Sequence, residues 1–407
     1  MPDIPPPDLA RERKLIVVVA AVQFVNVLDF VMVMPMGPDF AIALGIDLTH
    51  LGAIGGAYTA AAAVSGLLAS AFLDRFDRRT ALAWGMVGLG IGTLAGGFAW
   101  DLRSLIAARV LAGAFGGPAT AVAMAIVADA VPPARRGRAM GAVMGSFSIA
   151  SVVGVPAGLA LAQHLGWRWP FLVIGGACLA VAALARAQLP QLRDHVARAS
   201  AEAASVRDAV GILGRREFWL SYAMGATAAL SSFLLIPNLS AYTQYNLGLP
   251  RGDLGLLYLY GGLASLVAMW SAGRAVDRLG ALSVLNLTVV VFFGVLWTGF
   301  WHWTGAVSAI AVFVPYFVAN AARNVAFNAT ASKVPAAHER ARFMSAMSAV
   351  QHIGAATGAL VSGLMLVERA DHRLAGMGAV AMASFAASLL LPVWLALVER
   401  QLRRAPA

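Results

Sequence analysis

Charged residues are scarce in this chain. Only 12% of its 407 residues are Asp, Glu, Lys or Arg, whereas 60% are hydrophobic. An ordinary soluble domain has roughly 25% charged residues, so this chain has too little polar surface to cover a globule of its size. The composition therefore excludes a large soluble protein as the working class and predicts an integral membrane protein.

Cysteine is almost absent as well. The single residue of this type, Cys178, excludes an internal disulfide and any metal site built on a pair of thiolates. It lies inside an apolar run, where an inert packing role is expected. The chain also lacks a Gly-Lys-Ser/Thr phosphate loop, a His-Glu-x-x-His motif and a Gly-x-Ser-x-Gly motif. These absences argue against an ATP-hydrolysing pump and against an enzyme.

Long apolar runs make up most of the sequence. A helix needs about 20 such residues to cross the hydrocarbon core of a bilayer. The first run is longer than the core of a signal peptide and contains Asn26 and Asp29, so we expect it to be retained. The predicted spans are 15–36, 50–72, 80–100, 103–128, 138–163, 168–188, 217–243, 253–275, 282–301, 304–330, 341–367 and 373–397.

Lysine and arginine are distributed unevenly among the loops. The great majority of the 30 basic residues fall in the two tails and in the alternate loops that share their side. The positive-inside rule then places both termini in the cytoplasm, which predicts a bacterial inner (cytoplasmic) membrane protein. The net charge of +10 accordingly reflects topology, and no nucleic-acid partner is expected.

The longest hydrophilic stretch, 189–216, divides the chain into two sets of six spans. We interpret it as a cytoplasmic linker, partly helical at the membrane surface. It separates an N-terminal bundle (15–188) from a C-terminal bundle (217–397), with cytoplasmic tails at 1–14 and 398–407. The lipid bilayer is the surrounding partner of both bundles.

Similar loop motifs occur at corresponding places in the two halves. "SAFLDRFDRR" (70–79) follows the second span and "SAGRAVDRLG" (271–280) follows the eighth. The fourth span ends in "DAVPPARRGRAMG" (129–141) and the tenth in "SKVPAAHERARFMS" (332–345). Their matching order predicts an internal duplication about an axis along the membrane normal. Chance similarity of basic loops is the alternative.

These motifs resemble those of the major facilitator superfamily. The similarity extends over essentially the whole chain and is greatest to the twelve-helix drug–proton antiporters, in the branch of bacterial sugar and drug efflux permeases. The second-span motif departs from the family at Ser70 and Asp77, where glycines are usual. The matching residues are Asp74, Arg75, Arg78 and Arg79 after span two, Arg109 and Gly113 in span four, and Gly145, Gly154, Pro156 and Gly158 in the span-five antiporter motif.

The resemblance implies an all-α membrane fold. Twelve transmembrane helices would form two six-helix bundles, related by a pseudo-twofold along the membrane normal, around a central cavity. The protein would work as a monomer by alternating access, with a small-molecule substrate and protons as partners. A proton gradient would take the place of any cofactor, and no metal is expected.

The resemblance also implies a charge cluster at the cytoplasmic face. Such a cluster would hold the two halves together while the outer side is open. Solvated loop charges that only orient the protein are the alternative. The residues of this predicted cytoplasmic gate are Asp74, Arg75, Arg78, Arg79, Asp129, Asp277 and Arg278.

The span-five motif has physical consequences of its own. Gly145, Gly154 and Gly158 remove side chains from one helical face, which lets another helix approach closely. Pro156 removes a backbone donor and bends the helix. We interpret this face as a tight interface between the two halves, with generic small-residue packing as the alternative.

Two buried charges are predicted to meet. In the fold that the resemblance implies, spans one and four both line the central cavity, and the helical rise places Asp29 and Arg109 each about 9 Å from the outer side of the core. Asp29 could take up a proton when its contact with Arg109 loosens, which would couple transport to the proton gradient. Alternatively, the two residues form a permanent structural pair.

A polar stripe on span ten is predicted to face the cavity. Arg323 lies about 6 Å deeper than Asp29, beside Asn320, Asn324 and Asn328, and such a stripe would be costly in lipid. His352 could titrate near neutral pH or pack as a hydrogen-bonded residue. The predicted cavity residues are Gln23, Asn26, Asp29, Arg109, Asn238, Tyr242, Asn320, Arg323, Asn324, Gln351 and His352.

The predicted function is secondary active export of a small molecule by proton antiport. Two arginines against one carboxylate do not suit a polycation, so a neutral polyol, a neutral amphipathic drug or a weak organic anion is favoured. Proton-coupled import of an organic anion or a sugar acid is the alternative, and the span-five motif favours export. A receptor without transport activity would have no evident use for buried charges at matched depth.

Overall fold

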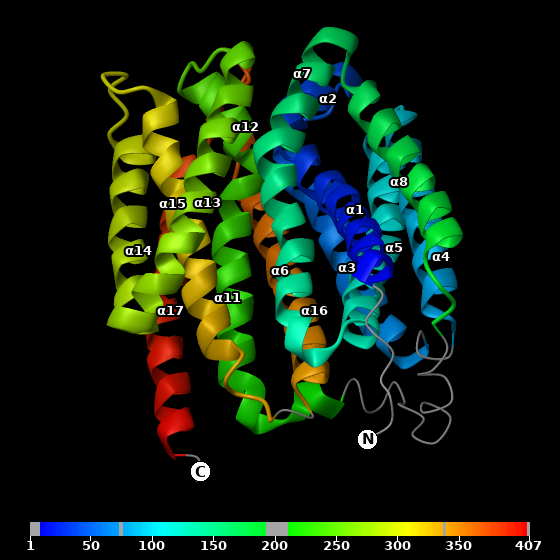
Figure 1. Ribbon diagram of the computed structural model, residues 1–407. Helices are drawn as coiled ribbons and strands as arrows, with labels where there is room; N and C mark the ends of the chain where they lie inside the picture. Colours follow the sequence, from blue (N-terminus) through cyan, green and yellow to red (C-terminus); the bar gives the residue numbers. More distant parts are fainter. Residues whose placement is uncertain (1–8, 73–75, 193–210, 337–338, 405–407) are drawn as a thin grey trace, which may run out of the picture.

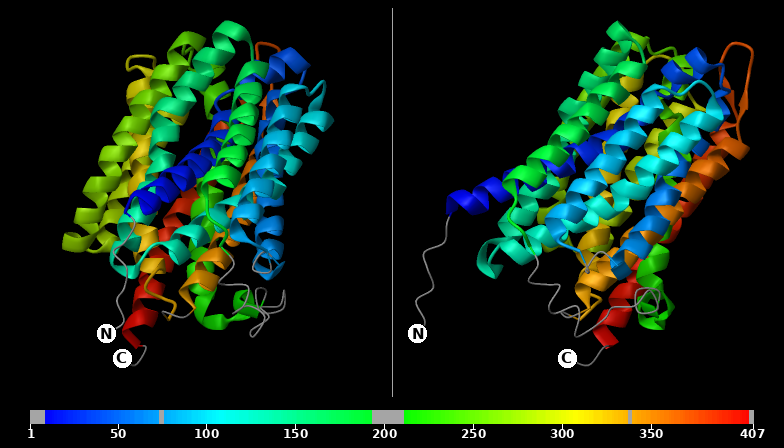
Figure 2. Two further views of the ribbon diagram at one scale, coloured as in Figure 1. Left: turned by 45° about the vertical axis from the view of Figure 1, so that its right-hand side comes forward. Right: turned by 90° about the vertical axis from the view of Figure 1, so that its right-hand side faces the viewer.

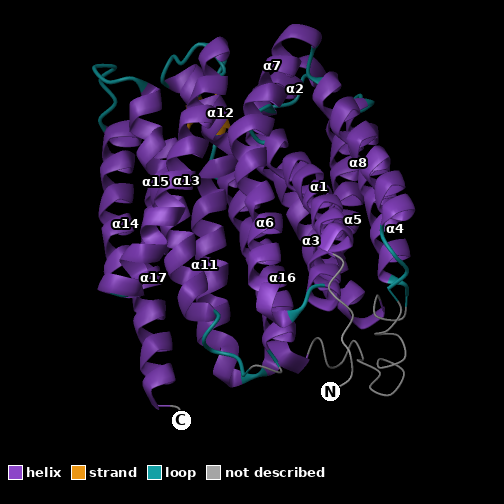
Figure 3. Cartoon of the chain, viewed as in Figure 1, coloured by secondary structure: helices purple, strands orange, loops and turns teal. Residues whose placement is uncertain are grey.

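The computed structural model describes residues 9–72, 76–192, 211–336 and 339–404. Nearly all of these residues are helical, as Figure 3 shows. Eleven helices in the described part of the chain are long and apolar enough to cross a membrane. Helix α16 (Arg340–Leu364) packs among them against α3 (Leu51–Phe72) and α11 (Trp219–Leu235), and it completes a set of twelve. The predicted twelve-helix fold is therefore confirmed.

The N-terminal half contains six spans. A short helix, α2 (Gly37–Leu44), and a 3₁₀ turn, η1 (Leu48–His50), follow the first of them. The six spans are α1 (Leu9–Val33), α3, α4 (Arg78–Gly97), α5 (Leu102–Ala130), a fifth span made of α6 (Pro133–Ile149), the π-helix η3 (Ala150–Gly154) and α7 (Val155–Leu165), and α8 (Arg168–Gln188).

The C-terminal half repeats this arrangement. Its first span is α11, extended by η6 (Ile236–Asn238), α12 (Leu239–Ala241) and the π-helix η7 (Tyr242–Asn246). A two-stranded antiparallel hairpin, β1 (Val367–Glu368) and β2 (Leu374–Ala375), precedes the last span. The other spans are α13 (Leu254–Leu279), α14 (Ala281–Leu296) with η9 (Trp297–Trp301), α15 (Ala309–Ala331), α16 and α17 (Met377–Arg404).

Local capping explains the two shortest predicted divisions. Asp101 accepts a hydrogen bond from the Ser104 amide and forms a capping box at the start of α5. Ser308 caps α15 by accepting from the Ile310 amide, after a loop that turns at Gly305 with φ 71°. The tenth span therefore begins at 309 rather than at 304, because the sequence "HWTGAVS" forms a loop of its own.

The two halves stand side by side in the bundle (Figure 1). The start of α1 and the end of α17 lie at the same end of the molecule, which we call the terminal end, and α2 and α7 lie at the distal end. Helices α3 and α16 pack against each other between the halves, and α13 packs against η3 and α7. Figure 2 shows the same arrangement from two further sides.

Toward the distal end, the two halves touch closely. At Gly52 and Gly363, a methyl group would overlap with the backbone of Ala359 and Thr49 in the other half. Toward the terminal end, the space beside glycines of α3 and α6 is open: a Cβ added at Gly66, Gly137, Gly141 or Gly145 would have no atom within 4 Å among the described neighbours. Among the described residues, the closest approaches between the halves therefore lie toward the distal end.

The predicted linker is described only at its two ends. Residues 193–210 lie outside the described part, so the prediction of surface helix there is not tested. At its C-terminal end, two 3₁₀ turns, η4 (Ile212–Gly214) and η5 (Arg216–Phe218), lead into α11.

Candidate functional site

The centre of the candidate site is a buried ion pair in the N-terminal half. Asp29 on α1 and Arg109 on α5 are each 1% exposed. Arg109 Nη1 donates to Asp29 Oδ1 at 3.0 Å and to Oδ2 at 3.2 Å, and Nη2 donates to Oδ2 at 3.2 Å. The depth calculation from sequence predicted this contact, and the structure has it.

Polar groups from two further helices complete the site. Thr93 Oγ1 on α4 donates to Asp29 Oδ1 at 2.8 Å. The Arg109 guanidinium lies 4.6 Å from the ring centroid of Tyr58 on α3, which is a cation–π contact. Neither residue was predicted from the sequence, because single polar residues in spans two and three leave no spacing signal.

Asn26 ties the tyrosine to α5. The Tyr58 hydroxyl donates to Asn26 Oδ1 at 3.2 Å, and Asn26 Nδ2 donates to the Gly116 carbonyl at 2.9 Å and to Thr120 Oγ1 at 2.8 Å. Because a side chain at Gly116 would overlap with Tyr58, glycine is required for this approach. The amide therefore fixes the ring below the guanidinium.

The strength of this pair depends on both residues being charged. Two opposite charges that leave water together lose solvation of several kcal/mol each, and their mutual attraction must offset that cost. If the carboxylate takes up a proton, the guanidinium keeps its charge but loses its ionic partner. Protonation would therefore weaken a three-contact interaction at the centre of the N-terminal half.

Arg323 was predicted to face the cavity, and in this structure its hydrogen bonds lie within the C-terminal half. Its side chain is buried inside the C-terminal half, where it is 4% exposed. The guanidinium donates to the hydroxyl groups of Ser231 at 3.2 Å and Ser388 at 3.3 Å, and it also bonds Ser232 and Asn320. Helical spacing could not reveal this orientation, because the serines that satisfy it lie on spans seven and twelve.

Two other predicted cavity residues also point elsewhere. The Tyr242 hydroxyl donates to the Gly299 carbonyl at 2.7 Å, and its ring stacks on Phe300. Asn238 is fully buried and donates to Ser362 Oγ at 3.0 Å. Asn238 lies within the break in span seven at η6 and Tyr242 lies beyond it, and this break turns the helix in a way that a regular periodicity does not predict.

The remaining predicted cavity residues fall into two groups. Gln23 is buried, and its Oε1 has no hydrogen-bond partner among the described residues. Four residues keep partial or full exposure, which agrees with a wall open to the terminal end: Asn320, Asn324, Gln351 and His352.

One ion pair is described among the residues of the predicted cytoplasmic gate. Arg78 Nε lies 2.6 Å from Asp129 Oδ2, which joins the start of α4 to the end of α5. Asp277 and Arg278, at the end of α13, are exposed. Asp74 and Arg75 lie outside the described residues. In this state the Arg78–Asp129 pair is a contact within one half, so the latch between the halves stays a prediction for another state.

Asp77 and Arg79 hold the start of the linker. Asp77 Oδ1 accepts from the Leu192 amide at 2.7 Å, and Oδ2 caps α4 by accepting from Thr80. Burial alone would raise the pKa of Asp77, but the hydrogen bonds from Leu192 and Thr80 lower it below its usual value. Arg79 Nη1 donates to the Leu189 carbonyl at 3.3 Å. The departure from glycine at position 77 thus has a structural use.

The glycines of the span-five motif pack differently from the prediction. A Cβ at Gly154 would contact Leu28, and one at Gly158 would contact Met32, so both glycines face α1 in the same half. Pro156 lies in the first turn of α7, directly after the π-helix η3. The interface between the halves instead uses Gly262 of α13, whose Cβ would lie 3.0 Å from Val152. The predicted role of the span-five glycines between the halves is therefore wrong.

An ion pair between the halves closes the distal end. Arg251 Nε donates to Asp39 Oδ1 at 2.7 Å and Nη2 donates to Oδ2 at 2.6 Å. Glu368 of β1 accepts from the Leu48 amide of η1 at 2.6 Å. Both contacts join the opposite halves, and neither was predicted. We call the Asp39–Arg251 pair the distal latch.

Breaking the distal latch is expected to open the distal end. The pair is partly buried, with Asp39 21% and Arg251 23% exposed at the side chain. Hydrogen bonds to charged groups contribute about 1.5–3 kcal/mol, so Asp39→Asn should shift the open-to-closed ratio on the order of tenfold or more. Fluorescence transfer between labels on the two halves at the distal end would measure this ratio.

A charge exchange provides the control for the distal latch. The double variant Asp39→Arg, Arg251→Asp restores an opposite-charge pair and should recover much of the closed population. An unchanged ratio in Asp39→Asn would show that the backbone contacts alone keep this end sealed.

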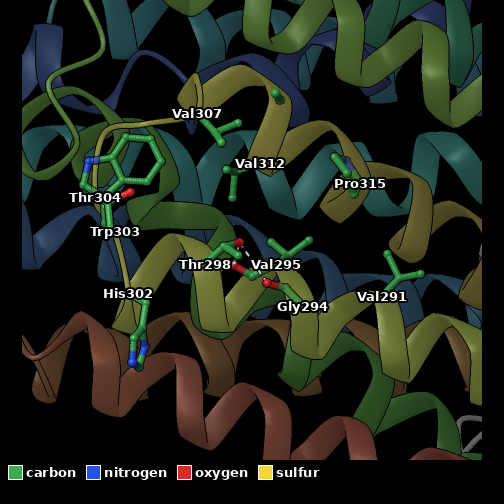
Figure 4. Close-up of a pocket in the computed structure, with 11 residues that line it drawn as sticks. Val291, Gly294, Val295, Thr298, His302, Trp303, Thr304, Val307, Val312 and Pro315 are labelled. Atoms are coloured by element: carbon green, nitrogen blue, oxygen red, sulfur yellow. Dashed lines mark hydrogen bonds between the residues drawn. The ribbon is translucent and has the colours of Figure 1, made fainter.

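A separate cavity lies at the distal ends of α14 and α15. It has a volume of about 420 Å³ and is lined by Val291, Val295, His302, Trp303 and Pro315, among others (Figure 4). All its lining residues belong to spans nine and ten and the loop between them. It is therefore not the space between the halves and has no contact with the Asp29–Arg109 pair.

Comparison with known proteins finds relatives of this chain among drug efflux and drug resistance proteins. The chain is 28% identical over 247 residues to a chloramphenicol resistance protein of Streptomyces lividans, which covers 59% of this chain and 61% of that protein. It is 26% identical over 301 residues to a chloramphenicol efflux pump of Mycobacterium tuberculosis, covering 65% and 71%. It is 35% identical over 164 residues to a puromycin resistance protein of Streptomyces alboniger, covering 40% and 32%. The chain thus spans less than two thirds of the length of the first and third of these relatives.

Solved structures share the fold. A bacterial homologue of the human lysosomal transporter Spinster, in an inward-facing and occupied conformation, superposes with a TM-score of 0.77 at 15% identity, covering 98% of this chain and all of that one. A D-xylose–proton symporter superposes with a TM-score of 0.70 at 14% identity, covering 93% and 96%. The sequence profile of the Major Facilitator Superfamily matches residues 19–359. This chain belongs to the Major Facilitator Superfamily and is a multi-pass membrane transporter.

Proposed function

We propose that this transporter exports small neutral or weakly charged organic molecules in exchange for protons. The observation that carries the proposal is the buried Asp29–Arg109 pair. Asp29 is a carboxylate within a membrane-spanning helix, and a single proton bound to it would weaken its ionic interaction with Arg109. Intramembrane ionisable pairs of this kind mark proton and substrate pathways.

The pair would couple the two flows as follows. In the terminal-open state, Asp29 is ionised and Arg109 and Thr93 hold it. In the distal-open state, Asp29 takes up a proton from the outside and the ion pair weakens. Return to the terminal-open state releases that proton into the cytoplasm, where substrate can enter. The proton gradient then drives export without any cofactor.

Export of a neutral compound is favoured by two features. The relatives named above include a chloramphenicol efflux pump and two resistance proteins, at 26–35% identity. The partly exposed polar residues of the C-terminal half, such as Asn320, Asn324 and Gln351, are uncharged. We infer that a neutral amphipathic drug such as chloramphenicol is a suitable first substrate to test.

The positive-inside pattern supports an orientation with both termini in the cytoplasm of a bacterial inner membrane. With that orientation, the terminal end faces the cytoplasm and the structure is open inward. One chain contains both bundles and the pair between α1 and α5, so a monomer suffices for the cycle.

Net flux in inverted vesicles tests direction and coupling together. With the interior made acidic, the wild-type protein should accumulate labelled chloramphenicol inside, and a protonophore should abolish the accumulation. With membrane potential clamped, each pH unit corresponds to about 1.4 kcal/mol per proton, which sustains roughly a tenfold gradient of a neutral substrate. Proton-driven loss of substrate from the same vesicles would instead support the alternative, proton-coupled import of an organic anion or a sugar acid.

A further inference from the structure

One aromatic pair crosses between the two halves in the described part of the chain. Phe30 of α1 and Phe233 of α11 stack with ring centroids 6.0 Å apart and an interplanar angle of 25°. Both side chains are only partly buried. The rings therefore belong to the contact between the halves and still offer surface that a substrate could touch.

The aromatic pair is connected to the ion pair by direct contacts. Phe30 follows Asp29 in the sequence and stacks on Tyr58 with a centroid distance of 5.2 Å and an angle of 30°. Tyr58 in turn lies 4.6 Å below the Arg109 guanidinium. A continuous series of contacts thus runs from the buried carboxylate through two rings to the opposite half.

The internal repeat places the two phenylalanines at equivalent positions. Phe30 and Phe233 are 203 residues apart, and the same separation relates the motif Asp74–Arg75 to Asp277–Arg278 and Val131–Pro132 to Val334–Pro335. At this separation the residue equivalent to Asp29 is Ser232. Both halves therefore have the ring, but only the N-terminal half has the carboxylate beside it.

We propose that Phe30, Tyr58 and Phe233 form an aromatic lock that keeps the empty transporter closed at the distal end while Asp29 is ionised. The inference rests on the proposed coupling role of Asp29 and adds positioning residues that link this role to the seal. The lock prevents the transporter from changing sides with neither proton nor substrate bound.

The surroundings of Asp29 determine how the lock responds to protons. The groups that face Asp29 are Arg109 from α5, the Thr93 hydroxyl from α4, Tyr58 from α3 and Cys178 from α8. Helices η3 and α7 present Gly154 and Gly158 to α1 and contribute no titratable group there among the residues described. Arg109 is thus the cation that holds both the carboxylate and the Tyr58 ring.

Protonation of Asp29, which in the proposed cycle comes from the outside in the distal-open state, keeps this arrangement released. A proton adds to a carboxylate oxygen of Asp29, and the attraction that positions Arg109 weakens. The guanidinium can then leave the Tyr58 ring, which loses its cation–π contact. Without a fixed Tyr58, the Phe30 ring can turn away from Phe233 and the halves can part. A substrate that inserts between Phe30 and Phe233 has the same effect.

Distance measurements between spin labels test the lock. Labels are attached to His164→Cys and Asp371→Cys, which are exposed positions in opposite halves at the distal end, and Cys178 can stay because it is buried. The substrate-free protein with an intact lock should be distal-closed at high pH and should gain a distal-open population as the pH falls. In Phe233→Leu and Phe30→Leu, the distal-open population at high pH should rise up to about tenfold, with a flattened pH profile.

Two controls identify a merely structural effect. Phe233→Tyr preserves a stacking ring and should keep the pH profile of the unchanged lock. Phe300→Leu removes a ring that stacks on Tyr242 inside the C-terminal half and should leave the profile unchanged. If Phe300→Leu flattens the profile as strongly as Phe233→Leu, the effect is general loosening and the lock is overturned.

The Asp29→Asn variant separates this inference from the proposed function. If Asp29→Asn retains the pH profile, the coupling role of Asp29 is wrong. If Asp29→Asn flattens the profile but both leucine variants keep it, coupling stands and the aromatic lock is rejected. If all three variants flatten it, both are supported.

Discussion

The Asp29→Asn variant is expected to lose concentrative transport and to retain downhill transport. The amide resembles the protonated carboxyl in size but can neither bind nor release a proton. In inverted vesicles with an imposed difference of about one pH unit, the accumulation ratio should fall from roughly tenfold to about one. Labelled chloramphenicol measured inside and outside the vesicles reports this ratio.

The matched control is another carboxylate that lies outside the candidate site. Asp371 in the exposed loop after β1 pairs with Arg373 at the surface, and Asp371→Asn should leave accumulation unchanged. Downhill counterflow of substrate verifies that Asp29→Asn is folded and binds. Wild-type accumulation by Asp29→Asn would assign the proton to a different group.

The Arg109→Met variant is expected to show the largest loss of stability. It leaves the Asp29 carboxylate buried without its cation, and removing one partner of a buried pair costs about 3–5 kcal/mol. The remaining hydrogen bond from Thr93 cannot replace three contacts from the guanidinium. Thermal unfolding in detergent, followed by intrinsic tryptophan fluorescence, would measure the loss.

The double variant Asp29→Leu, Arg109→Met decides how this loss arises. Apolar residues of similar volume remove both charges together, and such replacements are often neutral or stabilising. The double variant should therefore unfold near the wild-type temperature but should not transport against a gradient. If it is as unstable as Arg109→Met, packing of the arginine chain against Tyr58 is the main contribution.

The sequence was sufficient to predict the fold because the solvent is a bilayer. Spans of about 20 apolar residues, their basic loops and the duplicated motifs depend on local composition and order, which a single sequence contains. The Asp29–Arg109 contact was predicted from two premises: residue counts gave the two charges equal depth, and the family resemblance placed spans one and four around one cavity. Because a helix rises by a fixed distance per residue, the number of residues from the end of a span gives the distance of a side chain from the membrane surface.

Rotation about the helix axis was harder to predict than depth. Arg323 bonds serines on α11 and α17, and these partners cannot be identified from spacing on α15. Of the span-five glycines, Gly154 and Gly158 do pack closely, but their neighbour is α1 rather than the other half, and Gly145 has no neighbour within 4 Å among the described residues. In each case the helical periodicity of the sequence shows which residues share one face of a helix. It does not show which neighbouring helix packs against that face.

The sequence by itself determined that this protein has twelve spans in two related halves, with a carboxylate and an arginine at matching depth in the first half. Only the tertiary structure decided which side of the bundle is sealed and what seals it. The Asp39–Arg251 latch and the Phe30–Phe233 stack each join residues about 200 positions apart. Their formation depends on how two preformed bundles rest against each other, and because that relation changes during transport, no local pattern specifies it.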